Sequence, residues 1–306
     1  MPPGFTFRSH REVGVKRLVR AAMTVVSASA LIAAIATPAA DAMPVSRLPR
    51  ATMTPIIAIH GIVLGTCPSM DSSVSMSGPM WYMWNHGEWN RPYDAISYYK
   101  CDQDGTAIGA AADNNTPIET IAHDLAWYLY TTYSSHGRTV EIVGHSLGGL
   151  IARAALAAFA AHNPTYPPTL LVQDVVAISA PFGGTDFGCS ATSYQCREML
   201  PGSSFLTWLA QNQDPQGTNG TDWTVIGGSP CDVVPAASAT AMTGAHRWLY
   251  YLGKPTCYDH DSYLWDASSA MDAAVAWEWP TATRYQKAYA FHPQAAIMMA
   301  VDSSLW

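Results

Sequence analysis

The sequence predicts an α/β domain built on a mainly parallel central sheet, with helices covering both faces. Short apolar segments rich in β-branched residues alternate along the chain with longer segments of helical periodicity. This alternation is typical of repeated strand–helix–strand units. The predicted mature chain of 264 residues, 43–306, is long enough for one large domain with a sizeable core.

The first half of this domain contains two expected strands and one expected helix. Residues 55–59 form a continuous apolar run, and residues 95–99 alternate between apolar and polar side chains. Thr116 begins a predicted capping box, with Pro117 at the first helical position and Glu119 at the third. Apolar residues then recur at helical spacing and predict a stripe that faces a sheet: Ile118, Ile121, Ala122, Leu125 and Leu129.

The second half continues the alternation. Residues 139–143 predict a buried strand, and the Ala- and Leu-rich segment 150–158 predicts a helix that ends near Asn163. Three further strands are expected at 175–178, 223–227 and 248–252. Residues 267–277 are expected to form a helix, and no element is assigned to 281–306.

The N-terminal segment has the pattern of a secretory signal peptide over residues 1–42. An uncharged apolar run from Ala21 to Ala36 follows a basic region, and Ala40-Asp41-Ala42 has the small-x-small pattern of a cleavage site. We therefore expect cleavage near Ala42, a secreted protein, and a single domain over 43–306. The apolar run is too short for a membrane span, so no stable transmembrane anchor is expected.

The charge balance argues against a nucleic-acid partner. Residues 1–42 hold five of the sixteen Lys and Arg and two of the twenty-three Asp and Glu. The remaining chain therefore carries eleven basic and twenty-one acidic side chains, a formal charge of −10. An acidic chain with so few cations lacks the basic surface that phosphate binding requires.

All six cysteines lie after the predicted signal peptide, and an even number in an exported chain predicts three disulfides. Six cysteines allow fifteen pairings. Pairing of nearest neighbours in the sequence is the preferred set: Cys67–Cys101, Cys189–Cys196 and Cys231–Cys257.

The most informative motif is Gly144-His145-Ser146-Leu147-Gly148. It stands between a predicted strand and a predicted helix, which is the context of a nucleophile elbow. A serine on so sharp a turn adopts a strained backbone, and glycines let strand and helix pass closely. We therefore expect Ser146 to act as a nucleophile.

A serine hydroxyl needs a base to remove its proton and a carboxylate to orient that base. Asp232 is the expected acid because it lies five residues past Gly227, after a predicted strand. Asp222 is the rival, but it precedes that strand and so belongs at the opposite edge of the sheet. Asp259 and Asp261 are too close to the candidate base in sequence to orient it easily.

His260 is the expected base because it follows the last predicted strand. His246 enters that strand instead of leaving it, and His292 lies in the unassigned tail. His123 belongs to the predicted helix, where a surface or packing role is expected. His145 adjoins the nucleophile, and its side chain is expected to point away from the proton to be moved.

An oxyanion formed by the attack requires donors that are already aimed at it. The backbone N–H of Leu147, directly after the nucleophile, is one expected donor. The second is expected from the loop that follows the first strand, His60-Gly61-Ile62, with the N–H of Ile62 as the donor.

In these segments the chain resembles the α/β-hydrolase superfamily, and within it the secreted bacterial lipases and esterases. The resemblance spans roughly residues 54–265 and rests on three segments together with Asp232 and His260: residues 59–62, 144–149 and 180–185. It implies the α/β-hydrolase fold, a serine triad, a two-amide oxyanion hole and no cofactor. Some lipases of this kind hold calcium, but no Asp-rich loop here requires it, and no metal is expected.

The expected partner is a lipid or ester substrate, with a lipid–water interface as a further possibility. An aromatic and methionine cluster, residues 80–84 with Trp89, lies between Cys67 and Cys101. It either lines an acyl pocket, or caps the site at a lipid surface, or packs beneath a disulfide-closed loop.

The leading hypothesis is a secreted carboxylic ester hydrolase, a lipase or esterase that works through an acyl-enzyme. An acyltransferase, a thioesterase or a polyester depolymerase would use the same machinery and is the nearest alternative. A non-catalytic exported binding protein is the third reading. The strained serine argues against it, because binding alone has no use for such a turn.

Overall fold

The computed structural model describes residues 54–88, 91–186, 193–251, 258–265, 272–277, 285–290 and 292–302. The chain divides into two units, Met1–Met43 and Pro44–Trp306, and all of the described residues belong to the second. The predicted signal peptide, residues 1–42, lies outside the described residues.

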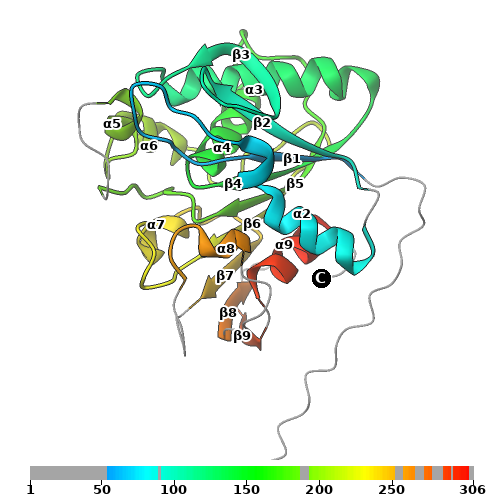
Figure 1. Ribbon diagram of the computed structural model, residues 1–306, viewed down its shortest axis with the longest axis vertical. Helices are drawn as coiled ribbons and strands as arrows, with labels where there is room; N and C mark the ends of the chain where they lie inside the picture. Colours follow the sequence, from blue (N-terminus) through cyan, green and yellow to red (C-terminus); the bar gives the residue numbers. More distant parts are fainter. Residues whose placement is uncertain are drawn as a thin grey trace, which may run out of the picture. The chain divides into compact units, whose positions relative to one another are not determined.

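The described residues form a nine-stranded sheet with the order β3-β2-β1-β4-β5-β6-β7-β8-β9 (Figure 1). Neighbouring strands pair in parallel from β3 to β7, whereas β8 and β9 are antiparallel to their neighbours. The mainly parallel sheet is therefore confirmed. Its strands are β1 Ile56–Ile59, β2 Tyr93–Tyr99, β3 Thr106–Ala112, β4 Val140–His145, β5 Val172–Ile178, β6 Asp222–Gly227, β7 Arg247–Tyr251, β8 Asp272–Trp277 and β9 Tyr285–Ala290.

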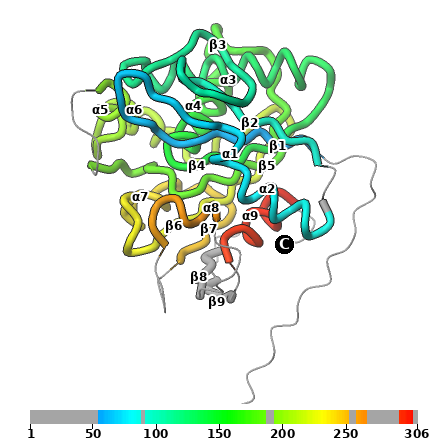
Figure 2. The backbone as a smooth tube through the Cα atoms, in the orientation of Figure 1, coloured from blue at the N-terminus to red at the C-terminus, as the bar shows by residue number. Residues whose placement is uncertain are grey.

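Helices cover both faces of the sheet. In β1, Ile57 and Ile59 belong to the core cluster that includes α3 and α4, whereas Ile56 and Ala58 belong to the cluster that includes α2, α8 and α9. Helices α2, α8 and α9 contact one another (Figure 2). The α-helices are α1 Ser72–Ser75, α2 Ser77–Met83, α3 Ile118–Thr132, α4 Leu147–Ala160, α5 Tyr194–Glu198, α6 Ser204–Leu209, α7 Ala236–Ala239, α8 Ser262–Trp265 and α9 Pro293–Val301, with a π-helical turn η1 Trp84–Glu88 and a 3₁₀ turn η2 Ser134–His136.

The predicted apolar stripe of α3 is confirmed, but its capping box is wrong. All five stripe residues are buried. Pro117 occupies the N-cap in an extended conformation, and no side chain of the N-cap accepts a hydrogen bond. The hydroxyl of Thr116 instead accepts the N–H of Asp113 at 3.1 Å. A carboxylate from α5 serves the helix end, because the N–H of Ile118 donates to Glu198 at 2.8 Å.

The helix predicted over 267–277 is also wrong within the described residues, because 272–277 form strand β8. Alanine has the highest helix propensity, but differences in propensity are worth only a fraction of a kcal/mol per residue. Pairing with β7 on one side and β9 on the other provides backbone partners along the whole segment. The unassigned tail contains β9 and the buried helix α9, and His292 caps α9 by accepting the N–H of Ala295.

A carboxyl group without a hydrogen-bond partner among the described residues is buried at the amino end of the sheet. Asp174 on β5 is 1% exposed, and its two carboxylate oxygens accept no hydrogen bond from the described residues. Burial, reinforced by the nearby charge of Asp222, raises the pKa of Asp174 to about 7. The folded state therefore loses stability relative to the unfolded state as the pH rises from the ordinary pKa of a carboxyl toward about 7.

We expect Asp174→Asn to stabilise the protein at neutral pH. The folded state keeps the Asp174 proton up to about pH 7, whereas the unfolded state releases it near pH 4, so the wild-type free energy of unfolding falls across this window. The variant has no such fall. Urea unfolding at several pH values should show a difference between variant and wild type that grows from about pH 4 to 7. The same substitution at the half-exposed Asp113 is the control, and an equal difference at all pH values would contradict the assignment.

Candidate active site

The strand–turn–helix around Ser146 has the geometry of a nucleophile elbow. Ser146 follows β4 and precedes α4 with φ 54° and ψ −122°, a left-handed conformation that non-glycine residues rarely adopt. A β-carbon at Gly148 would lie 2.2 Å from the carbonyl oxygen of Ile59, and one at Gly144 would lie 2.8 Å from the backbone of Gly148. The glycine spacing of the motif therefore reflects contacts too close for any side chain.

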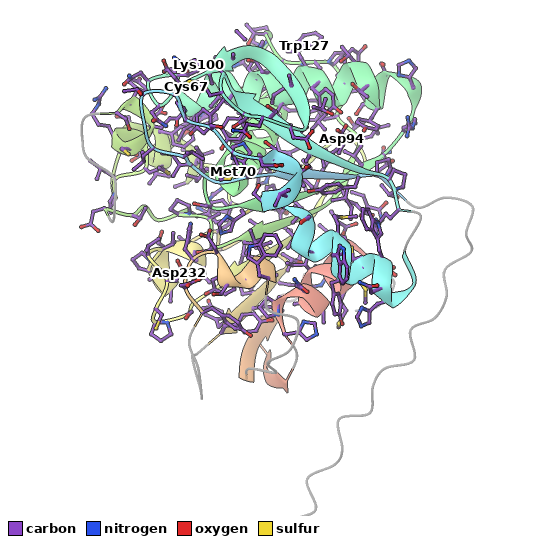
Figure 3. All side chains as sticks on the ribbon, viewed as in Figure 1. Cys67, Met70, Asp94, Lys100, Trp127 and Asp232 are labelled. Atoms are coloured by element: carbon purple, nitrogen blue, oxygen red, sulfur yellow. A yellow bond between two sulfur atoms is a disulfide. The ribbon has the colours of Figure 1, made fainter. Side chains whose placement is uncertain are left out.

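The expected acid and base meet at the carboxyl edge of the sheet. Asp232 follows β6, and His260 comes after β7. His260 Nδ1 lies 2.8 Å from Asp232 Oδ1, which also accepts the N–H of Val234 at 2.9 Å. A carboxylate only accepts hydrogen bonds, so this contact assigns the imidazole proton to Nδ1 and leaves Nε2 able to receive one. Figure 3 shows Asp232 near α7 and α8.

The environment of Asp232 favours its charged form. Burial alone would raise the pKa of this carboxyl, but hydrogen bonds from His260 and Ser179 bring it below the usual value. Ser179 stands directly after β5, and sequence reasoning missed it. The sequence offered one signal, which is position. Ser179 is a polar residue directly after a buried strand, and Asp232 likewise lies in the loop after β6.

His145 contacts the loop that carries the expected base. Its Nε2 lies 2.8 Å from the carbonyl oxygen of His260, and the two rings are 4.6 Å apart. Burial, together with the neighbouring His260, lowers the pKa of His145 to about 3. The neutral ring donates from Nε2 to that carbonyl and therefore holds the backbone of the loop that carries His260. Through its neighbour, Ser146 is tied to the same loop.

The rival acid and bases lie elsewhere. Asp222 begins β6 at the amino edge, where it pairs with Arg247 at 2.7 Å and His246 at 2.5 Å. Hydrogen bonds to two carboxylates raise the pKa of His246 to about 9, so this ring is protonated at neutral pH. His292 caps α9, and His123 lies on α3 beside the carbonyl of Thr165.

The loop after β1 packs against the serine. A β-carbon on Gly61 would lie 2.9 Å from Ser146 Cβ and 3.4 Å from its Oγ. The absence of a side chain at Gly61 therefore lets the backbone reach the serine. The next residue is Ile62, an expected oxyanion donor. The other expected donor, Leu147, begins α4, where a backbone N–H has no partner within the helix.

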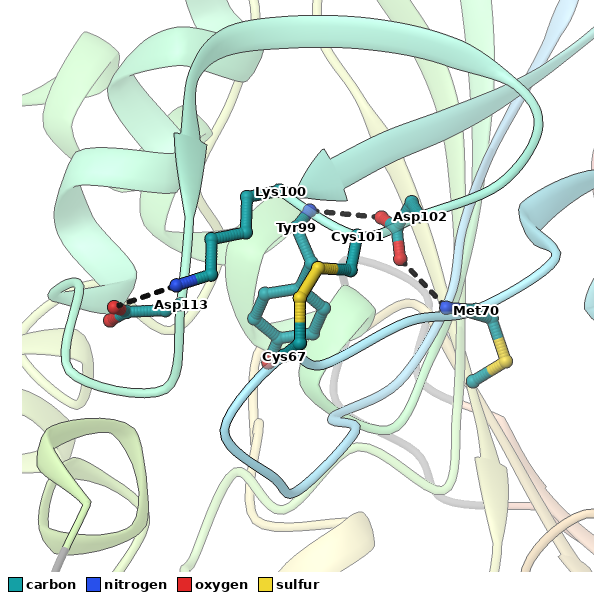
Figure 4. Close-up of a disulfide and its surroundings, with 7 residues drawn as sticks. All are labelled: Cys67, Met70, Tyr99, Lys100, Cys101, Asp102 and Asp113. Atoms are coloured by element: carbon teal, nitrogen blue, oxygen red, sulfur yellow. Dashed lines mark hydrogen bonds and ion pairs between the residues drawn. A yellow bond between two sulfur atoms is a disulfide. The ribbon is translucent and has the colours of Figure 1, made fainter.

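Buried side chains also contact the loop after β1. The hydroxyl of Tyr98 lies 2.7 Å from the Gly61 carbonyl, and the Tyr98 ring stacks on His60 with centroids 4.2 Å apart. Asp102 lies 3.1 Å from His60 Nε2. It also accepts the N–H of Met70 at 2.9 Å and of Tyr99 at 2.9 Å (Figure 4).

The expected disulfide Cys67–Cys101 is confirmed and stands next to Asp102 (Figure 4). It closes a loop with a sequence separation of 34. A cross-link of that span stabilises a fold by about 3–4 kcal/mol in the loop-entropy model. Cys196 and Cys231 are also disulfide-bonded. Their expected partners lie outside the described residues: Cys189 and Cys257.

The aromatic and methionine cluster divides between core and surface. Met80 and Met83 are buried in the core cluster that includes α9, whereas Trp81 is 67% exposed and Trp84 is 39% exposed. Trp89 lies outside the described residues. The packing interpretation therefore holds for the methionines, and two large apolar rings face solvent.

A hollow of about 390 Å³ lies beside the loop that follows β1. Amide, hydroxyl and carboxyl side chains form most of its wall, and Leu64 adds an apolar side chain that is 48% exposed. Its lining residues are Leu64, Gly65, Thr66, Asp113, Asn114, Asn115 and Ser193.

One family match bears on the chemistry expected of Ser146. A family model described as "Putative serine esterase (DUF676)" matches residues 107–214, which include Ser146. No curated protein matches the chain.

Solved structures with a similar arrangement include the product of gene lin2722 from Listeria innocua, at 18% identity and a TM-score of 0.46, covering 82% of this chain and 94% of that one. The mature lipase BlEst2 of Bacillus licheniformis is 19% identical with a TM-score of 0.38, covering 60% and 68%. Phospholipase PlaB of Legionella pneumophila is 14% identical with a TM-score of 0.44, covering 74% and 51%.

The family match and the strained serine together support a serine hydrolase that acts on esters. The sheet has seven parallel strands and two antiparallel strands at one edge. The elbow follows β4, within the parallel part. Over the described ranges, no helix has the length and apolar character needed to cross a bilayer.

Proposed function

We propose that this chain, which has the α/β-hydrolase fold, is a secreted carboxylic ester hydrolase that works through an acyl-enzyme intermediate. The observation that carries the proposal is the 2.8 Å contact between His260 and Asp232, on loops that the sheet order brings to the edge where Ser146 stands. A strained serine and an oriented imidazole at one edge are the arrangement that acyl transfer requires.

The reaction proceeds in two steps, acylation and deacylation. Ser146 Oγ attacks the ester carbonyl while its proton passes to His260 Nε2, and Asp232 stabilises the imidazolium. The N–H groups of Ile62 and Leu147 bind the oxyanion. Collapse of this intermediate breaks the bond to the alcohol, which leaves with the proton from His260. Water then repeats the sequence on the acyl-enzyme, and release of the carboxylic acid restores the free serine.

The substrate class is an acyl ester, with lipid esters favoured. The exposed rings of Trp81 and Trp84 lie on neighbouring segments, α2 and η1, and tryptophan is suited to the boundary between water and lipid. The disulfide between Cys67 and Cys101 and the predicted signal peptide support export, because disulfides persist in oxidising compartments.

The test combines covalent labelling with a substrate series. A fluorophosphonate that reacts with activated serines should give one adduct, which peptide mass spectrometry should locate at residue 146. p-Nitrophenyl esters from acetate to palmitate should be hydrolysed with burst kinetics. A steep rise in rate when an emulsion forms indicates a lipase, whereas preference for short soluble esters indicates an esterase. Absence of both the adduct and any ester turnover would overturn the proposal.

A further inference from the structure

Ser179 makes a contact with the acid–base pair that the two-step reaction above does not use. It follows β5 and is completely buried. Its hydroxyl donates to Asp232 Oδ2. The hydroxyl oxygen of Ser179 also lies 3.3 Å from His260 Nδ1. The hydroxyl therefore stands beside both groups on the side of the imidazole that faces away from the proton transfer.

The backbone of Ser179 is held in an unfavourable conformation to reach this place. Its φ is 45°, in the left-handed region, where a residue with a β-carbon is destabilised relative to glycine. Its N–H donates to the carbonyl oxygen of Ile226 at 2.7 Å, which fixes the turn after β5 against β6. Residues in such conformations persist only where the surrounding structure imposes them, and they gather at functional sites.

The hydrogen bonds to Asp232 define what the hydroxyl does. Oδ1 accepts from His260 Nδ1 and from the N–H of Val234. Oδ2 accepts from Ser179. Donors on both oxygens set the rotation of the carboxylate about its χ2 bond, so that Oδ1 faces the imidazole. A buried carboxylate that loses such a donor is both less well oriented and less stable as an anion.

We propose that Ser179 is a positioning residue of the reaction, which orients Asp232 toward His260 and sustains its charge. The proposal rests on the function proposed above. Ser179 does not act on the substrate, so its effect should fall on kcat and leave KM unchanged.

Removing the hydroxyl should shift the pH dependence in one direction. Without this donor the carboxyl of Asp232 has a higher pKa, because one hydrogen bond to its charged form is gone. Protonation of this carboxyl removes the charge that orients and stabilises the base, so the acidic limb of the kcat/KM profile moves to higher pH.

Two substitutions separate the hydroxyl from the backbone. Ser179→Ala removes the hydroxyl and keeps the β-carbon, whereas Ser179→Gly removes both and relieves the strain of a positive φ. Ser134→Ala is the matched control, because Ser134 is a buried serine whose hydroxyl accepts the N–H of Leu171 at 2.9 Å, away from Asp232 and His260. Steady-state kinetics on p-nitrophenyl butyrate across pH, with circular dichroism on each variant, form the experiment.

Both Ser179 variants should lower kcat about ten-fold, the factor that about 1.4 kcal/mol represents at the low end for a hydrogen bond to a charged group. The acidic limb of the kcat/KM profile should move to higher pH by about half a unit or more. Ser134→Ala should retain wild-type kinetics. A loss in the alanine variant with full activity in the glycine variant would assign the role to the backbone and overturn the proposal. So would a wild-type profile in both. Failure of the proposed function itself is distinguishable, because Ser146→Ala would then keep its activity.

Discussion

Replacing Ser146 with alanine is expected to lower kcat for ester hydrolysis by about 10⁵–10⁶-fold. The alanine has no oxygen to attack the carbonyl, so the acyl-enzyme cannot form. The fold should survive, because alanine retains the β-carbon and takes the same left-handed turn between β4 and α4. Hydrolysis of p-nitrophenyl butyrate and thermal melting, measured on the same preparation, check both expectations.

Ser134→Ala again provides the control, since it removes a buried hydroxyl at a distance from the elbow and should leave turnover unchanged. The fluorophosphonate adduct at residue 146 should disappear only in the Ser146 variant. Wild-type turnover in a folded Ser146→Ala protein would remove the serine from the nucleophile role, and the proposed reaction with it.

Replacing Asp232 with asparagine is expected to reduce kcat by about 10⁴-fold. Asparagine has nearly the same shape but no charge, and its amide can donate to His260 Nδ1, which moves the ring proton to Nε2. The nitrogen that must accept the serine proton is then already protonated. The measurement is kcat for a soluble ester near neutral pH, with melting as the check on folding.

Asp259→Asn is the matched control for this variant. Asp259 adjoins His260 in the sequence, but it is exposed, and its carboxylate accepts the N–H of Ser262 at 2.9 Å. An asparagine oxygen can accept the same bond, so turnover should stay near the wild-type value. If Asp222→Asn, and not Asp232→Asn, abolishes turnover in a folded protein, the acid has been assigned to the wrong edge of the sheet.

Much of the candidate site follows from the order of residues along the chain. Asp232 and His260 come after successive strands, and parallel strands place such loops at one edge. The contact between their side chains agrees with that expectation. Ser179 satisfies the same positional rule, but a serine after a strand is too common to single out without its contact to Asp232.

The two wrong predictions, the helix over 267–277 and the capping box of α3, have one cause. In both, partners distant in the sequence override the local preference. Residues 272–277 have the alanines of a helix, yet β7 and β9 provide a strand partner on each side. The N-terminus of α3 is served by Glu198, which lies 80 residues away from Ile118. Local propensities are worth a fraction of a kcal/mol per residue, so such contacts readily override them.

The sequence by itself determined the elbow at Ser146, the mainly parallel sheet and the order along the chain of the loops that carry Ser146, Asp232 and His260. These depend on backbone requirements that a few adjacent residues satisfy, such as glycines where Gly148 meets Ile59. Only the tertiary structure decided that His145 holds the His260 loop and that Ser179 contacts Asp232. Those contacts join residues on different strands, and their geometry depends on how the strands pack, because hydrogen bonds require an alignment that no local pattern specifies.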